Sequence, residues 1–188
     1  MTHSKIAEIE NTPNPNAKKF ILKEPVTWGV TCSYENIEEA KDDELASALF
    51  DIEHVSNVFY VDKWITVTQD GGADWADLVR KVAAPIRSAA TAVAQTEVIL
   101  EAATSAMADL SPEDQKRFDR ISVLLDDQIR PYLKSDGGDL QVTGLVGNQL
   151  SVHYQGACGS CPSAISGTLR GIENLVRSIE PGINVVAV

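Results

Sequence analysis

The sequence predicts an α+β protein built from two small mixed domains joined by an Ala-rich, helical connector. Each half of the chain contains one run of alternating apolar and polar residues, the pattern of a β-hairpin, with segments of helical periodicity before and after it. The segment 88–110 between them lacks Gly and Pro and is rich in alanine, which favours helix. We therefore place an N-terminal domain at 1–87, the connector at 88–110 and a C-terminal domain at 111–188, since 188 residues suffice for two cores.

The N-terminal domain is expected to hold a strand, a helix, a hairpin and a second helix. The strand is AKKFILKE, preceded by a rigid TPNPN turn. The helix DDELASALFDI has acids in its first turn, where they favour the positive end of the helix dipole. In HVSNVFYVDKWITVTQDGG, alternating residues flank Asp62 and Lys63, which predicts a hairpin ending at a Gly-Gly turn. An apolar stripe then runs along ADWADLVRKVAAPI, and Pro85 predicts the end of that helix.

The C-terminal domain is expected to follow the order α-β-β-α-β. Ser111 suits the N-cap of the first helix, and Pro131 should kink or end that helix. An SDGGDL turn leads into the hairpin LQVTGLVGNQLSVHYQG, in which alternate residues from Leu150 to Tyr154 share one face. A second helix follows the cysteines, a Pro-Gly pair stops it, and INVVAV is the last strand.

Composition argues against several classes of function. The net charge of −11 repels phosphate backbones, so nucleic acid is not an expected partner. No window approaches eighteen continuous apolar residues, so no membrane span is expected. The start, MTHSKIAEIENTPNPN, has neither the apolar core of a signal peptide nor the Arg-rich pattern of a transit peptide. Three cysteines are too few for a disulfide framework, which favours a reducing compartment, the cytoplasm.

The chemistry is concentrated in QGACGSCPSAI, where Cys158 and Cys161 are spaced C-x-x-C. Cys161 precedes Pro162, a residue typical of the first helical position, and a helix N-terminus favours the thiolate form of nearby cysteines. The small residues around the thiols permit close approach of another backbone or of inorganic sulfide. Three kinds of site fit: a redox disulfide with Cys158 as nucleophile and Cys161 as resolving thiol, a zinc site bridging two chains, and an iron–sulfur cluster site.

Ligand supply distinguishes these possibilities. Zinc and iron–sulfur sites commonly need four thiolates, and the motif supplies two. The third cysteine, Cys32, lies in the other domain and is expected to be a small, half-exposed hydrophobic residue. A second copy of the same domain would add two more thiolates across a two-fold axis. A cluster held in that way depends on a separable interface, which suits a donor of clusters.

Polar residues near the motif are expected to be structural. Asp136 and Asp139 flank two glycines in a turn that needs positive φ, and their carboxylates should cap backbone groups instead of binding a metal. His153 is expected to be a solvated side chain on the polar face of its strand.

The run RPYLKSDGGDL…GACGSCPSAI resembles the NifU-type C-terminal domain of the Nfu family of iron–sulfur cluster scaffold and carrier proteins. TPNPNAKKF and ALFDIEHVSNVFYVDKWITVT are similar to the Nfu N-terminal domain. The resemblance implies that Cys158 and Cys161 ligate a [4Fe–4S] cluster that bridges two C-terminal domains of a homodimer. It also implies an upstream cluster donor, apo iron–sulfur client proteins as recipients, and an N-terminal domain that contributes to partner recognition. The protein would then be a maturation factor and not an enzyme.

Overall fold

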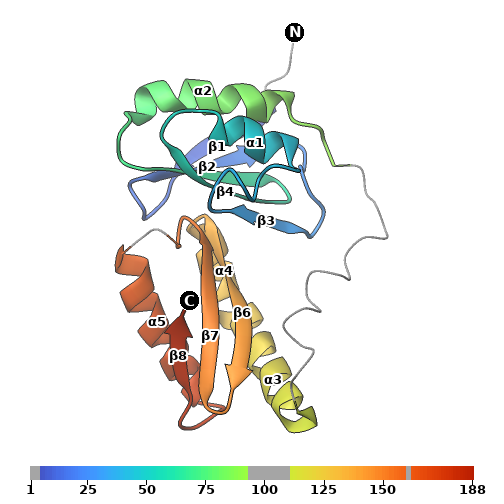
Figure 1. Ribbon diagram of the computed structural model, residues 1–188, viewed down its shortest axis with the longest axis vertical. Helices are drawn as coiled ribbons and strands as arrows, with labels where there is room; N and C mark the ends of the chain where they lie inside the picture. The colour runs from blue at the N-terminus through green and yellow to red at the C-terminus, as the bar shows by residue number, and fades with distance from the viewer. Residues whose placement is uncertain (1–4, 93–110, 160–161) are drawn as a thin grey trace. The chain divides into compact units, whose positions relative to one another are not determined.

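Two units, each with its own sheet and core, make up the chain in the computed structural model (Figure 1). The structure describes residues 5–92, 111–159 and 162–188. The units are Met1–Thr96 and Glu97–Val188. The predicted α+β class with two domains is confirmed. Most of the predicted helical connector, 93–110, lies outside the described residues; of its described part, Ser88 is the last residue of the preceding helix and 89–92 are not helical.

The N-terminal unit is a five-stranded antiparallel sheet in the order β1-β2-β5-β4-β3. Two helices cover one face of the sheet (Figure 1). Alternate strand residues on that face pack against the helices, and Phe20, Leu49 and Ile65 are fully buried there. The elements are β1 (Ile6–Asn11), β2 (Ala17–Leu22), β3 (Thr31–Tyr34), α1 (Glu44–Phe50), β4 (Val55–Val61), β5 (Trp64–Gln69) and α2 (Trp75–Ser88).

The β4–β5 hairpin and helix α1 form where the sequence predicts them. Val61 pairs with Trp64 across the two-residue turn, and Asp62 has a φ of 50°, in the left-handed region that tight hairpin turns require. Helix α1 begins after Asp43, whose carboxylate accepts a hydrogen bond from the Ala46 N–H at 2.8 Å.

The edges of this sheet and the end of α2 differ from the prediction. The sequence does not predict β1 and β3, which are edge strands whose residues, apart from Ile6, are exposed or half-buried, so that their hydrophobic alternation is weak. The predicted helix end at Pro85 is wrong, because α2 continues to Ser88. A proline in the last turn removes only its own N–H, and its carbonyl still accepts the Ala89 N–H at 2.9 Å.

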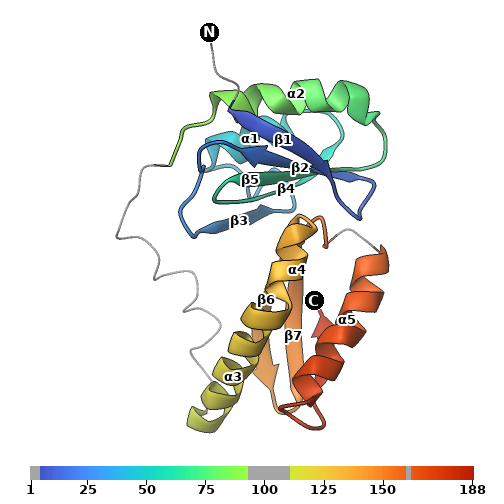
Figure 2. The ribbon, with the colours of Figure 1, turned by 180° about the vertical axis from the view of Figure 1, so that it is seen from behind.

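The C-terminal unit packs three helices against one face of a three-stranded sheet (Figure 2). The sheet order is β6-β7-β8, with β6 and β7 antiparallel and β8 parallel to β7, so α5 is the crossover that the parallel pair requires. The predicted order is confirmed, except that the first helix is divided in two. The elements are α3 (Pro112–Gln128), α4 (Arg130–Ser135), β6 (Gly138–Val146), β7 (Gln149–Gly156), α5 (Pro162–Arg177) and β8 (Asn184–Ala187).

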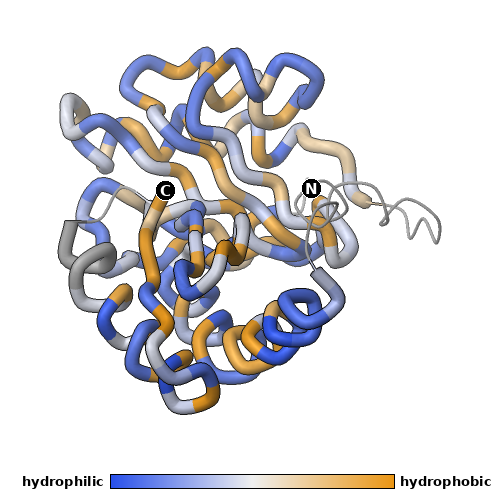
Figure 3. The backbone as a smooth tube through the Cα atoms, turned by 60° about the horizontal axis from the view of Figure 1, so that its bottom comes forward, coloured by the Kyte–Doolittle hydropathy of each residue, from blue (hydrophilic) through white to orange (hydrophobic). Residues whose placement is uncertain are grey.

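Sequence patterns account for the helices of this unit. Ser111 caps α3 by accepting the Asp114 N–H at 3.1 Å, as predicted. The chain kinks at Ile129, and Pro131 occupies the first turn of α4, where the missing N–H has no helical partner to lose. Hydrophilic and hydrophobic colours alternate along the helices in Figure 3, the pattern of helices that bury one side.

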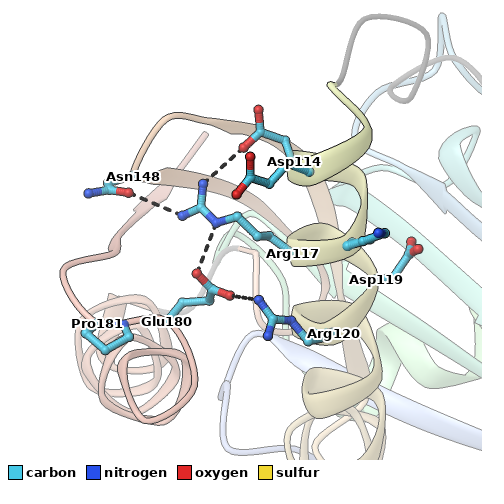
Figure 4. A pocket seen from close by; sticks show the side chains of 9 residues that line it. Asp114, Arg117, Asp119, Arg120, Asn148, Glu180 and Pro181 are labelled. Carbon is cyan, nitrogen blue, oxygen red and sulfur yellow. Dashed lines mark hydrogen bonds and ion pairs between the residues drawn. The ribbon is translucent and has the colours of Figure 1, made fainter.

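Arg117 joins the start of α3 to the end of α5 and to the β6–β7 turn (Figure 4). Its Nε donates to Glu180 Oε2 at 3.0 Å, and its Nη1 donates to Asp114 Oδ1 at 3.0 Å. The guanidinium also donates to the Gly147 carbonyl at 2.9 Å and to Asn148 Oδ1 at 3.2 Å. The side chains of Arg117 and Glu180 are only 19% and 12% exposed, so solvent screens this ion pair weakly.

We expect Arg117→Ala to lower the free energy of unfolding of the C-terminal unit by about 1–2 kcal/mol, because four hydrogen bonds between three elements are lost. Urea unfolding would measure the change. Lys116→Ala is the matched control, since it removes an exposed cation from the same turn of helix. Equal unfolding midpoints for the two variants would contradict this role.

Candidate functional site

The DGGD turn places the start of β6 beside the cysteine loop. Gly137 has a φ of 84°, a conformation that favours glycine, and its carbonyl accepts the Ala157 N–H at 3.2 Å. Gly138 pairs with Gly156 at the end of the hairpin. The loop that carries Cys158 is therefore hydrogen-bonded to the turn, and the position of each depends on the other.

Gly138 lies in close contact with the first cysteine of the motif. A Cβ atom on Gly138 would lie 2.7 Å from Cys158 Sγ and 2.5 Å from the Gln155 carbonyl oxygen, closer than real side chains approach. The sulfur thus occupies space that any residue other than glycine would fill at this position. The positive φ predicted for this turn is found at Gly137, whereas Gly138 is needed for this close packing.

Asp139 anchors the same turn from inside the unit. It is 1% exposed, and its Oδ1 accepts the Leu140 N–H at 2.8 Å, which confirms the predicted backbone-capping role. Its Oδ2 lies 3.7 Å from Nη1 of Arg130, and Arg130 Nε lies 2.7 Å from Asp126 Oδ1. A buried carboxylate needs such partners, and they tie the turn that touches Cys158 to helices α3 and α4.

Cys158 is 4% exposed and belongs to the apolar cluster beneath the sheet. Tyr154, also 4% exposed, belongs to the same cluster. Burial raises the pKa of Tyr154 to about 12, and the nearby Cys158 thiolate adds to the effect, so the phenol keeps its proton at neutral pH. The sequence analysis treated Tyr154 as a core residue only.

The remaining predicted site residues are placed as follows. Cys161 lies outside the described residues, directly before the start of α5 at Pro162. His153 is on the opposite face of β7 from Tyr154, as predicted, and its Nδ1 lies 2.8 Å from the Val188 carbonyl oxygen. Within the described ranges, no group of three or more His, Cys, Asp or Glu side chains is arranged to hold a metal ion.

Cys32 lies in β3 of the N-terminal unit, beside two tyrosines that share one acceptor. Tyr34 donates to Asp43 Oδ2 at 3.0 Å, and Tyr60 donates to the same oxygen. Burial raises the pKa of the half-buried Cys32 thiol, and the charge of Asp43 adds to the shift, although hydrogen bonding with Tyr60 and Tyr34 partly offsets it. A thiol with a raised pKa is a poor nucleophile and a poor metal ligand at neutral pH.

We expect Cys32 to be alkylated by iodoacetamide roughly tenfold more slowly than free cysteine at neutral pH, because less of it is thiolate and access is restricted. The rate should be measured in a Cys158→Ser/Cys161→Ser background, where Cys32 is the only thiol. Addition of denaturant is the control and should restore the rate of free cysteine. A fast reaction in the folded protein would refute the structural assignment of Cys32.

Two family models match the chain in the order of the two units. "Scaffold protein Nfu/NifU N terminal" matches residues 6–92, and "NifU-like domain" matches residues 121–187, which include both cysteines of the motif. The human NFU1 iron-sulfur cluster scaffold homolog, named as mitochondrial, is 34% identical over 177 residues, which are 94% of this chain and 68% of the human protein. The chain belongs to the Nfu family of iron–sulfur cluster scaffold proteins.

Other members and structures extend the comparison. The Nfu protein of Drosophila erecta, named NFU1 iron-sulfur cluster scaffold homolog, mitochondrial, is 30% identical over 184 residues. Those residues are 97% of this chain, and the chain spans 64% of the length of the fly protein. The crystal structure of protein SAV1430 from Staphylococcus aureus aligns with 44% of this chain and 98% of its own, at 27% identity and a TM-score of 0.39.

The predicted resemblance to the Nfu family is confirmed in both units. Within the described residues, no helix combines the length and apolarity needed to cross a membrane. The matched human and fly Nfu relatives are named as mitochondrial, whereas the sequence analysis predicted the cytoplasm.

Proposed function

We propose that this protein is an iron–sulfur cluster scaffold and carrier whose Cys158 and Cys161 ligate a [4Fe–4S] cluster shared between two chains. The observation that carries the proposal is the C-x-x-C motif in a NifU-like domain. The motif comes directly before helix α5 in sequence, and the residue before Cys158 is hydrogen-bonded to the DGGD turn. The cluster is cargo in this role, and the protein is a carrier and not an enzyme.

The described geometry supports ligation by Cys158. Its sulfur packs against a glycine backbone, and the loop is hydrogen-bonded to the turn through Ala157 and Gly137. Small residues on both sides leave room for inorganic sulfide, which side chains at these positions would exclude. Cys32, in the other unit, has a raised thiol pKa and belongs to a tyrosine–aspartate network. The further ligands are therefore best supplied by a second copy of the C-terminal unit.

Transfer is ligand exchange at iron. An acceptor thiolate forms a bond to an iron atom as the bond from that iron to Cys158 or Cys161 breaks, and the released thiolate takes up a proton. Four such exchanges move the cluster, and no electron is gained or lost. A site divided between two copies favours release, because each partial exchange weakens an interface that already has to separate.

Other partners follow from this role. Apo iron–sulfur proteins are the recipients, and an upstream donor supplies the cluster. Nucleic acid and membrane have no part in it, since the net charge of −11 repels anionic surfaces. We retain the cytoplasm as the predicted compartment for this chain, and the reducing conditions that it offers keep the thiols available as ligands.

Thiol–disulfide exchange by Cys158 and Cys161 is the alternative function, and a zinc-bridged dimer is a further one. Exchange enzymes with this spacing place the motif between a strand and a helix of a βαβ framework. Here the motif likewise lies in sequence between β7 and α5, and α5 leads on to the parallel strand β8, so the strand order fits both roles. The match of residues 121–187 to the NifU-like domain favours the cluster role over the redox role.

Anaerobic reconstitution with iron and sulfide tests the proposal. Visible absorption, iron and sulfide analysis and molar mass should be measured on one sample. We expect a brown dimer with one four-iron cluster per two chains. A colourless product whose two thiols cycle to a disulfide would favour the redox alternative, and a colourless dimer that retains one zinc ion per two chains would favour the structural one.

A further inference from the structure

The buried hydroxyl of Tyr154 is the most informative polar group near the cysteine loop. Tyr154 is 4% exposed, and its Oη has no hydrogen-bond partner in the part of the chain that the structure describes. A buried hydroxyl without a partner is destabilising, and phenylalanine would fill the same space without that cost. A tyrosine at this position therefore indicates a partner that is present in another state of the protein.

The surroundings of Tyr154 narrow the identity of that partner. The side chains at positions 150, 152 and 154 alternate onto the helix-facing side of β7, where Tyr154 and Cys158 share one apolar cluster. The chain turns back after β7, with the Gly159 N–H donating to the Gly156 carbonyl at 3.2 Å. A Cβ on Gly159 would lie 2.9 Å from the Tyr154 carbonyl oxygen, so the residue after Cys158 folds back onto Tyr154.

The two side chains are buried in the same apolar cluster, four residues apart across the turn that ends β7. A tyrosine hydroxyl can donate its proton to an acceptor, and the Tyr154 hydroxyl has no partner among the described residues. A neutral donor beside a thiolate in an apolar cluster forms a charge-assisted hydrogen bond, which is stronger than one between neutral groups.

We propose that Tyr154 is a positioning residue whose hydroxyl donates a hydrogen bond to the sulfur of Cys158 when that sulfur is an anionic cluster ligand. The bond withdraws electron density from the sulfur, which stabilises the reduced cluster. It also stabilises the thiolate as it leaves iron, which speeds transfer. This inference rests on the proposed function, because it assigns Tyr154 to the same cysteine site.

Tyr154→Phe removes the hydroxyl and little else. In the apo protein the variant should be as stable as the wild type or more stable, because a buried unpaired hydroxyl is removed. In the loaded protein we expect a more negative reduction potential and roughly threefold to tenfold slower transfer to an apo ferredoxin. Tyr132→Phe is the matched control, since Tyr132 lies on α4, is 73% exposed and loses the same atom.

Urea unfolding of the apo proteins, redox titration of the loaded proteins and transfer kinetics test the proposal together. An unchanged potential and transfer rate in Tyr154→Phe would overturn it and leave the proposed function intact. A clear loss of apo stability would also overturn it, because the hydroxyl would then have a structural partner. Failure of the wild type to bind a cluster would overturn both proposals, and the wild-type reconstitution alone reveals that case.

Discussion

Gly138→Ala is expected to reduce cluster content at least tenfold and to destabilise the C-terminal unit by about 1–3 kcal/mol, the usual cost of overpacking. The added methyl would lie 2.7 Å from Cys158 Sγ and 2.5 Å from the Gln155 carbonyl oxygen. The carbonyl belongs to the backbone of β7 and cannot rotate away. The sulfur or the end of the hairpin must therefore move, and either movement displaces Cys158 relative to the rest of the site.

Gly144→Ala provides a matched control on the same strand. Gly144 also lies in β6, and a Cβ there would have no heavy atom within 4 Å. We expect its unfolding midpoint and cluster content to equal those of the wild type. Iron and sulfide per chain after reconstitution, together with urea unfolding of the apo proteins, measure both effects. Full loading of Gly138→Ala would show that the contact with Cys158 does not position a ligand.

The elements around both cores could be predicted because local sequence determines them. The β4–β5 hairpin, the Ser111 cap and the division of the helix near Pro131 follow from turn and cap residues within a few positions. The strands β1 and β3 could not be identified in this way. Both are edge strands, each hydrogen-bonded to one neighbouring strand only. Their residues are less buried than those of central strands, so the apolar alternation that marks a strand is weak.

The site was predictable only in part, for a different reason. The spacing of Cys158 and Cys161 indicates thiolate chemistry, because that chemistry depends on residue type and on a helix start. The packing of Cys158 against Gly138 joins residues twenty positions apart and depends on the registry of the β6–β7 pair. Two consecutive glycines before a hairpin are the only sequence signal for it, and the second of them was interpreted as a turn residue.

The Arg117 network and the environment of the Tyr154 hydroxyl also could not be predicted, because they depend on contacts between residues distant in sequence. Arg117 and Glu180 are separated by 63 positions, and no local pattern marks them as partners. Tyr154 fits the apolar alternation of β7 as well as leucine would, so periodicity places its ring and gives no information on its hydroxyl. Polar groups within an apolar pattern are assigned from the structure, because their partners are distant in sequence.

Cys158→Ala and Cys161→Ala are each expected to abolish both the cluster and the cluster-dependent dimer, whereas Cys32→Ala should change neither. In a site shared by two copies, one substitution removes two of the four thiolates, since every chain carries it. Two remaining ligands do not hold a four-iron cluster that commonly needs four. Loss should therefore be complete for either cysteine of the motif, and molar mass should fall from the dimer to the monomer.

Iron and sulfide content and molar mass under anaerobic conditions, measured on all three variants, distinguish a shared site from a site within one chain. Cys158→Ala also removes a buried sulfur, so its apo stability should be compared with that of Cys161→Ala to separate folding from ligation. Retention of a full cluster by Cys158→Ala or by Cys161→Ala would disprove bridging. A cluster retained by monomers of the wild type would do the same, because one chain would then supply every ligand, and Cys32→Ala would show whether the third thiol is among them.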